Sequence, residues 1–181
     1  MAAPHNPGRY GETWRQERID AYLADLERLR ERVVLSGGWA WHFMSPAGHT
    51  ELKHAHDHKD ADIFVSPPVL WQVIADLEAN GFRKVRTRFD KMPSAEDFRR
   101  YEKYTLVGDK DIRMTIDLFV RDVPSIEVRG WRVVEPEFLL SLYSTIHDSK
   151  SCFAVVAASR LIKEGKSPIG DAALTEIPTP R

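Results

Sequence analysis

The chain has 181 residues, 43% of them hydrophobic and 29% charged, which is typical of a globular protein of one domain and excludes global disorder. The 26 basic and 27 acidic residues give a net charge of −1, so the chain lacks the large basic excess of a general nucleic-acid binder. The lone cysteine, Cys152, excludes a disulfide framework, and no apolar run approaches the ~20 residues of a membrane span, so we expect a cytoplasmic protein.

The spacing of apolar residues predicts an alternation of helices and strands. In chain order we expect a helix at 12–32, a strand at 33–35, a helix from 39 to 44, a strand at 60–65, a helix between Pro67-Pro68 and Asn80-Gly81, strands at 82–89, 101–107, 112–120 and 128–134, and helices at 136–143 and 149–164. This order predicts one α+β domain with a mixed sheet. We divide it into a flexible arm (1–11), a core (12–135) and C-terminal helices with an extended tail (136–181).

The segment Ser36-Gly37-Gly38 lies where a predicted strand passes into a predicted helix. Glycines at such a turn let backbone N–H groups approach an anion closely, and the start of a helix favours negative charge. A phosphate chain fits such a turn, although a pair of glycines after a strand is more often a turn and nothing else.

Three aspartates are predicted to lie on strands. Asp60 and Asp62 are two residues apart, so their side chains share a face, with Cα atoms about 7 Å apart. Asp117 lies on the polar side of an alternating strand, and if the two strands pair, one face of the sheet carries all three. Carboxylates so placed suit Mg²⁺ and phosphoryl transfer with two metals. The simpler interpretations are a solvent-facing strand edge and, for Asp117, a surface residue beside Arg113.

The motifs Gly37-Gly38-Trp39-Ala40, His58-Lys59-Asp60-Ala61-Asp62-Ile63 and Ile116-Asp117-Leu118 together resemble those of the polymerase-β-type nucleotidyltransferase superfamily. They are most similar to the small branch with the aminoglycoside and lincosamide nucleotidyltransferases, and the toxin nucleotidyltransferases share the same skeleton. The resemblance covers residues 35–120. It implies a nucleotidyltransferase-like mixed sheet flanked by helices, with a short helical C-terminal region.

The resemblance also implies roles for particular residues. Ser36-Gly37-Gly38 would hold the nucleotide triphosphate. Asp60 and Asp62 would bind both of two Mg²⁺ ions, with Mn²⁺ as a substitute, whereas Asp117 would bind one ion and help to activate the acceptor hydroxyl. Lys150 stands roughly where some relatives have a lysine that contacts the triphosphate.

Four of the seven histidines fall in the polar segment 49–58. His54, His56 and His58 alternate, and imidazole groups on one face suit zinc or nickel, although their spacing matches no standard zinc pattern. His58, next to the aspartates, is placed to orient Asp60 or to contact a phosphate.

A basic cluster occupies residues 83–91, and we expect Lys84, Arg86 and Arg88 to share one face of the strand predicted there. Such a face would contact the triphosphate or a polyanionic acceptor such as RNA. The alternative is a solvated strand face.

These features predict a metal-dependent nucleotidyltransferase that moves a nucleoside monophosphate from a triphosphate such as ATP to an acceptor hydroxyl and releases pyrophosphate. The acceptor would be a hydroxylated small molecule or RNA, and no membrane is involved. The alternatives are an RNA-end nucleotidyltransferase, a catalytically degenerate nucleotide-binding module and a histidine-rich metal-binding protein.

Overall fold

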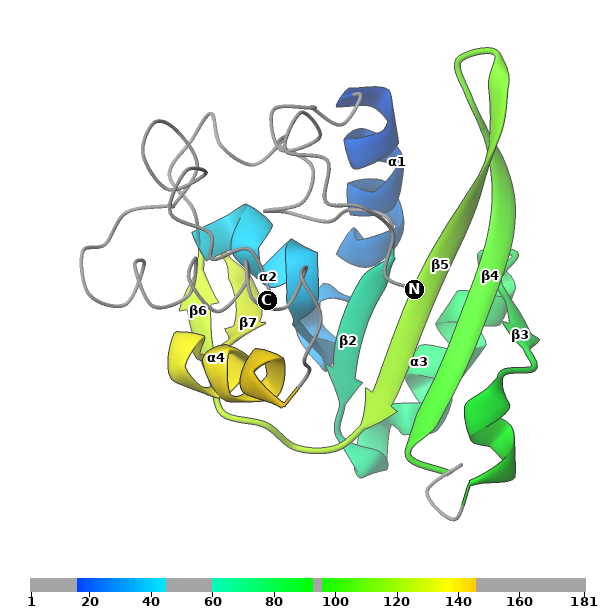
Figure 1. The fold of residues 1–181 in the computed structure, drawn as a ribbon. Helices are drawn as coiled ribbons and strands as arrows, with labels where there is room; N and C mark the ends of the chain where they lie inside the picture. Colours follow the sequence, from blue (N-terminus) through cyan, green and yellow to red (C-terminus); the bar gives the residue numbers. More distant parts are fainter. Residues whose placement is uncertain (1–15, 45–59, 93–95, 146–181) are drawn as a thin grey trace, which may run out of the picture.

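The computed structural model of the protein describes residues 16–44, 60–92 and 96–145, which form both helices and strands. Within these ranges the strands form one mixed sheet in the order β3-β4-β5-β2-β1-β7-β6 (Figure 1). The strands are β1 (Val33–Leu35), β2 (Ala61–Val65), β3 (Arg83–Val85), β4 (Phe98–Val107), β5 (Lys110–Val120), β6 (Ser125–Val128) and β7 (Trp131–Val134). The helices are α1 (Gln16–Glu27), α2 (Gly37–Met44), α3 (Leu70–Ala79) and α4 (Pro136–Ser144), with 3₁₀ turns η2 (Arg30–Arg32), η3 (Pro67–Val69) and η4 (Arg88–Lys91). The predicted α+β class is confirmed.

One face of the sheet lies against the hydrophobic core, and we call it the core face. Alternation along β2 and β5 turns apolar side chains such as Ile63, Ile116 and Leu118 toward this face, where none of the three is exposed to solvent. Helices α1 and α3 cover it. The salt bridge between Lys103 of β4 and Asp25 of α1 lies on this same face.

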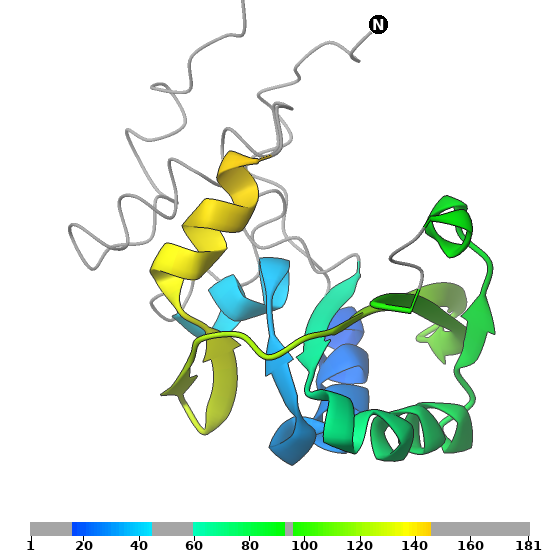
Figure 2. The ribbon, with the colours of Figure 1, turned by 90° about the horizontal axis from the view of Figure 1, so that it is seen from below.

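The opposite face, which we call the cleft face, carries the other side chains of β2, β4 and β5. The ring of Phe64 lies 6.5 Å from that of Phe138 in α4, and the ring of Phe98 lies 5.2 Å from that of Phe89 in η4. Figure 2 shows α4 and η4 rising on one side of the sheet, with α3 along the other. Asp62 and Asp117 belong to the cleft face, so α4 and η4 flank them.

Two of the predicted strands are wrong in extent. The strand predicted at 82–89 ends at Val85, because the Thr87 hydroxyl and the Asp90 carboxylate form a capping box that starts η4. The strand predicted at 128–134 is interrupted by a turn at Arg129-Gly130, where both residues have positive φ (53° and 77°), so Val128 ends β6 and β7 begins at Trp131. A non-glycine residue at positive φ is uncommon, which is why the pattern did not reveal this turn.

Two further boundaries differ: the helix predicted to run to residue 32 ends at Glu27 and is followed by η2, and β4 begins at Phe98, three residues before the predicted strand. The remaining elements in the described ranges lie close to their predicted positions. Helix α3 follows the two prolines and stops at Asn80-Gly81, and α4 matches the prediction for 136–143. Helix α2 begins at Gly37, two residues earlier than expected. The helix predicted at 149–164 and the arm lie outside the described residues. None of the helices in the described part of the chain is both long and apolar enough to cross a membrane.

Candidate functional site

Asp62 and Asp117 lie side by side on neighbouring parallel strands. They are register partners in the pairing of β2 with β5, so both side chains belong to the cleft face and their Cα atoms are about 4.8 Å apart. Asp117 is almost fully buried, with 6% of its surface exposed. Two carboxylates this close repel each other unless a positive charge compensates them. The strand pairing on which the sequence prediction depended is therefore present.

The glycine turn approaches one of these carboxylates directly. Gly37 has a φ of +55°, and a Cβ atom at this residue would come within 2.2 Å of the Asp62 Oδ2 atom. The Ser36 N–H donates a hydrogen bond of 2.8 Å to the Asp62 carbonyl. The Ser36 carbonyl accepts from Ala40, so α2 starts here, and the first N–H groups of the helix have no partner within it. A side chain at residue 37 would combine a strained positive φ with displacement of the Asp62 carboxylate.

Asp117 has a partner that the sequence analysis did not identify. Arg100 of β4 donates two hydrogen bonds to it, from Nε to Oδ1 and from Nη2 to Oδ2, each 2.6 Å long. The hydrogen bonds to Asp117 raise the pKa of the Arg100 guanidinium above its usual value, and the charges of Asp117 and Asp60 add to this. Counting back from the two-residue turn at Gly108-Asp109 would have placed Arg100 opposite Asp117.

Asp60 precedes β2 and is half-buried. Its charge acts on Arg100 and also on Tyr22 of α1, whose pKa is raised to about 12, mainly by burial. The Tyr22 hydroxyl accepts a 2.9 Å hydrogen bond from the N–H of Thr115, just before the stretch of β5 that pairs with β2. Asp60 is thus near the pair of aspartates, without being in register with either member.

The three aspartates provide ligand atoms that suit a divalent cation. Carboxylate oxygens are the ligands that Mg²⁺ prefers, and the guanidinium of Arg100 compensates one of the three charges by pairing with Asp117. Within the described ranges, however, no three His, Cys, Asp or Glu side chains already converge in a metal-binding arrangement. The set of oxygens fits Mg²⁺ in chemistry, with Asp62 and Asp117 as its closest pair.

A cleft of about 600 Å³ opens beside the pair. Ser36, Gly37 and Asp62 line one part of it, whereas the rest of its wall is largely apolar and includes Phe64, Phe119, Leu139, Leu142 and Tyr143. We call it the α4 cleft, because α4 supplies the last three of these residues. Its volume and its mixture of a polar part with apolar walls are those of a small-molecule site.

A second hollow, of about 560 Å³, lies toward the edge of the sheet, and we call it the arginine hollow. Arg86, Thr87, Arg88, Phe89, Arg100 and Glu102 line it. The prediction that Lys84, Arg86 and Arg88 share a strand face is wrong, since the chain leaves the strand at Val85, and Lys84 instead lies 3.3 Å from Asp90. Arg86 and Arg88 nevertheless meet at one hollow, together with the partner of Asp117.

The remaining predicted site residues lie outside the described part of the chain. These are Lys150, the candidate triphosphate lysine, and the histidine segment with His54, His56 and His58. The structure therefore brings together the glycine turn, Asp62 and Asp117, with Asp60 nearby and the two arginines on the flank.

Comparisons with known proteins bear on the fold alone. No family model matches the sequence, and no curated protein matches it. Among solved structures, the chain is similar to the crystal structure of JHP933 from Helicobacter pylori, with a TM-score of 0.60 and 13% identity over 84% of this chain and 68% of that one. The similarity supports an α+β fold built on a mixed sheet.

Proposed function

We propose that this protein is a metal-dependent nucleotidyltransferase with a nucleotidyltransferase-like fold. The observation that carries the proposal is the register of Asp62 with Asp117 on neighbouring parallel strands, together with the glycine turn that lies against Asp62. The motif resemblance, which involves the same residues, supports the same conclusion. The combination of a carboxylate pair, a helix start and a nucleotide-sized cleft is what such a reaction requires.

In this proposal the triphosphate lies along the start of α2, where the N–H groups of Gly37 and Gly38 donate to its oxygens. The nucleoside occupies the α4 cleft against Phe64 and Phe119. Asp60, Asp62 and Asp117 would hold Mg²⁺ or Mn²⁺, which when bound neutralises the charge that builds up on the phosphates.

The acceptor hydroxyl approaches from the side of Asp117. Its oxygen attacks the α-phosphorus, a new P–O bond forms, the bond to the leaving oxygen breaks, and pyrophosphate departs. The proton of the hydroxyl passes to the Asp117 carboxylate. For this the carboxylate must be released at least in part from Arg100, because both of its oxygens accept hydrogen bonds from that side chain.

The Arg100 pair favours a second candidate, a nucleotide-binding module without transfer activity. A carboxylate whose two oxygens are hydrogen-bonded to a guanidinium is less available as a metal ligand or base. Such a module would bind triphosphate through the glycine turn and the α4 cleft and would never release pyrophosphate.

A screen of four labelled triphosphates with Mg²⁺ against total RNA and pooled small hydroxylated acceptors tests the proposal. Wild type should release pyrophosphate and label an acceptor, and Asp62→Asn should not. The matched control is Asp111→Asn, which removes the same charge from an exposed position on β5. Binding of triphosphate with no label on any acceptor would identify the inactive module instead.

Thermal unfolding gives a readout that is independent of the acceptor. Triphosphate with Mg²⁺ should stabilise wild type by RT ln(1 + [L]/Kd), about 2.7 kcal/mol at a hundredfold excess over Kd. Asp62→Asn should lose most of this gain, whereas Asp111→Asn should keep it. If triphosphate with Mg²⁺ stabilises Asp62→Asn as much as it stabilises wild type, Asp62 does not belong to the binding site.

A further inference from the structure

The arginine hollow carries positive charge that its own neighbours do not offset. Of its four charged side chains, Arg100 is paired with Asp117, and Glu102 lies 3.8 Å from Arg113. Within the described ranges, no carboxylate lies at ion-pair distance from Arg86 or Arg88. Two uncompensated guanidinium groups at a concave surface attract an anion, and their planar forks match a phosphate group.

The backbone that presents these arginines is held in place before any ligand arrives. The Asp90 carboxylate accepts hydrogen bonds from the Thr87 N–H (2.6 Å) and hydroxyl (2.9 Å), and the Thr87 hydroxyl accepts one from Phe89. These bonds lower the pKa of Asp90 to about 2, so the cap is intact at neutral pH. The guanidinium of Arg88 also lies over the Phe89 ring, 4.9 Å from its centroid. A pre-ordered segment binds a ligand at a smaller entropic cost.

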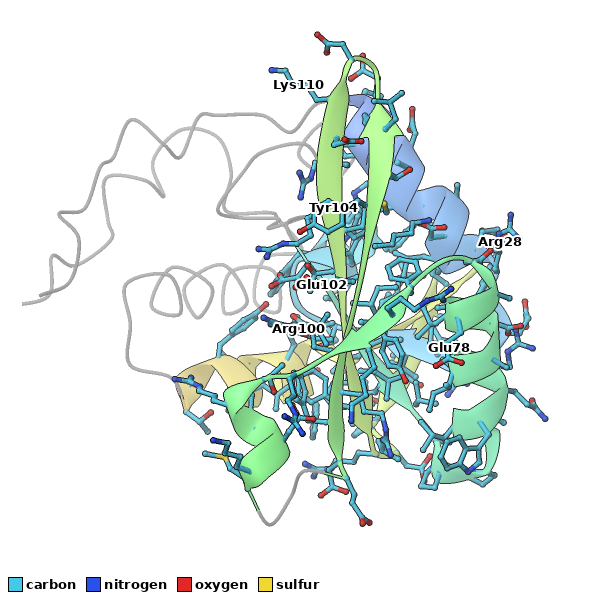
Figure 3. All side chains as sticks on the ribbon, turned by 90° about the vertical axis from the view of Figure 1, so that its right-hand side faces the viewer. Arg28, Glu78, Arg100, Glu102, Tyr104 and Lys110 are labelled. Carbon is cyan, nitrogen blue, oxygen red and sulfur yellow. The ribbon has the colours of Figure 1, made fainter. Side chains whose placement is uncertain are left out.

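The hollow lies on the opposite side of the carboxylate pair from the glycine turn. In the sheet, β1 with the glycine turn is next to β2 and Asp62, whereas β4 and β3 lie beyond Asp117. Arg100 both lines the hollow and bonds Asp117, so the hollow adjoins the carboxylate that would receive the acceptor's proton. In Figure 3, Arg100, Glu102 and Tyr104 follow one another on one side of the sheet, away from Arg28 and Glu78.

We infer that the acceptor carries a phosphate group, which Arg86 and Arg88 bind in the arginine hollow while its hydroxyl faces Asp117. This inference rests on the proposed function and gives it a substrate class. A volume of about 560 Å³ exceeds that of a phosphate and leaves room for an attached sugar and base. A polycation such as an aminoglycoside is repelled there, so the acceptor differs from that of the aminoglycoside branch.

The phosphate has two possible sources, the last nucleotides of an RNA strand or a small phosphorylated alcohol. The test compares Arg86→Gln/Arg88→Gln with Arg28→Gln/Arg132→Gln, which removes the same charge from exposed positions outside the hollow. The acceptors are a short single-stranded RNA with a free 3′ hydroxyl, a nucleoside 5′-monophosphate and an aminoglycoside. Pyrophosphate release is measured at varied acceptor concentration.

We expect the first double variant to raise the KM for the RNA or for the monophosphate at least tenfold, with the KM for triphosphate unchanged and the control variant like wild type. Whichever of the two acceptors shows this effect is the source. An unchanged acceptor KM, or the aminoglycoside as the best acceptor, would overturn the inference while leaving nucleotidyl transfer intact.

Binding of the fluorescently labelled RNA and monophosphate tests the hollow even if no acceptor reacts. If RNA binds there, losing the phosphate contact that the two arginines share should weaken binding tenfold or more and flatten the slope of log K against log salt by about 0.7, the value for one phosphate of a single strand. If Arg86→Gln/Arg88→Gln loses binding of either probe and wild type transfers no nucleotide, the phosphate site is supported and the proposed enzyme activity is not. Equal affinity of both probes for variant and wild type overturns the phosphate site.

Discussion

Two ion pairs on β4, three residues apart, differ in what they connect. Lys103 lies on the core face, where its Nζ atom is 2.6 and 2.7 Å from the two carboxylate oxygens of Asp25 and thereby ties α1 to the sheet. Arg100 lies on the cleft face and pairs with Asp117 of β5. Strands β4 and β5 are already joined along ten register pairs from Phe98 to Val107. The Arg100 pair therefore joins two elements that need no further connection.

We interpret the first as a scaffold ion pair and the second, under the proposed function, as part of the site. Taking charges out of water costs free energy, and an ion pair buried at such a cost is expected where it fixes an arrangement that nothing else fixes. Lys103 and Asp25 meet that condition, because they set where α1 lies. Arg100 and Asp117 do not, and their pair lies beside Asp62 at the mouth of a cleft. We interpret Arg100 as the counter-charge of a carboxylate kept for another purpose.

The largest expected effect is on turnover. Asp117→Asn and Asp62→Asn should each lower pyrophosphate release by roughly 10²–10³-fold or more, because each removes a carboxylate that would hold the metal ions on which stabilisation of the transferring phosphate depends. Lys103→Met should change turnover little in the fraction of protein that is folded. Near-normal turnover in Asp117→Asn would make both ion pairs structural and erase the distinction between them.

The next effect concerns stability and its dependence on metal. Lys103→Met should lower the free energy of unfolding by about 3 kcal/mol, because it leaves the buried Asp25 carboxylate unpaired. In chelator, Arg100→Met leaves Asp117 beside Asp62 without a counter-charge, which destabilises the fold. Because Arg100 is partly exposed, we expect the free energy of unfolding to fall by only about 1–2 kcal/mol.

Millimolar Mg²⁺ should separate the two variants in thermal or urea unfolding. In the proposed site a divalent cation would take the place of the missing guanidinium beside Asp117, so Arg100→Met should recover most of its loss, whereas Lys103→Met should recover none. Equal insensitivity of both variants to Mg²⁺ would show that Asp117 does not contribute to a cation site.

A smaller effect should come from the close contact between Gly37 and Asp62. Gly37→Ala combines a strained positive φ with a Cβ atom 2.2 Å from the Asp62 Oδ2 atom, and we expect a loss of about 2–3 kcal/mol together with loss of triphosphate binding.

The matched control for that variant is Gly81→Ala at the end of α3, where φ is +86° but no atom lies within 4 Å of the added Cβ. It should cost only the backbone strain, about 1 kcal/mol, and leave triphosphate binding unchanged. If the two variants lose equal stability and both bind triphosphate normally, the glycine turn does not depend on Asp62.

The sequence alone predicted the α+β class and most elements, because their hydrophobic periods are regular and their ends carry turn residues. Alternation around Asp62 and Asp117 sufficed to place both on the polar side of their strands. The pairing of β2 with β5 depends on contacts between distant segments, which no local pattern encodes, so the sequence could only suggest it. The Arg100 partner was within reach, since a two-residue turn fixes the β4–β5 register.

The basic segment shows where periodicity fails. Arg86 and Arg88 continue an alternating pattern, yet a local capping box between Thr87 and Asp90 outcompetes the strand after Val85. The sequence marked the arginines as a candidate contact surface, which stays a prediction, and gave them the wrong geometry. Arg86 and Arg88 lie near Arg100 because of this turn and because β3 is next to β4 in the sheet. An alternating sequence pattern predicts neither feature.

The smallest expected effect tests that capping box by pH. Its hydrogen bonds lower the pKa of Asp90 to about 2, below the value of about 3.9 in an unfolded chain, so the cap contributes its full stability above pH ~4 and loses it as the pH falls toward 2. Hydrogen exchange at the Phe89 amide, which donates to the Thr87 hydroxyl, should therefore become faster over this range, after correction for the intrinsic rate.

Thr87→Ala should show the faster exchange already at neutral pH and should weaken RNA or monophosphate binding less than Arg86→Gln/Arg88→Gln does, because it loosens the arginines without removing them. The Ser144 amide in α4 serves as an internal reference that neither change should affect. If the exchange rate at the Phe89 amide changes neither with pH nor in Thr87→Ala, then burial, and not the capping box, holds the backbone of the arginine hollow in place.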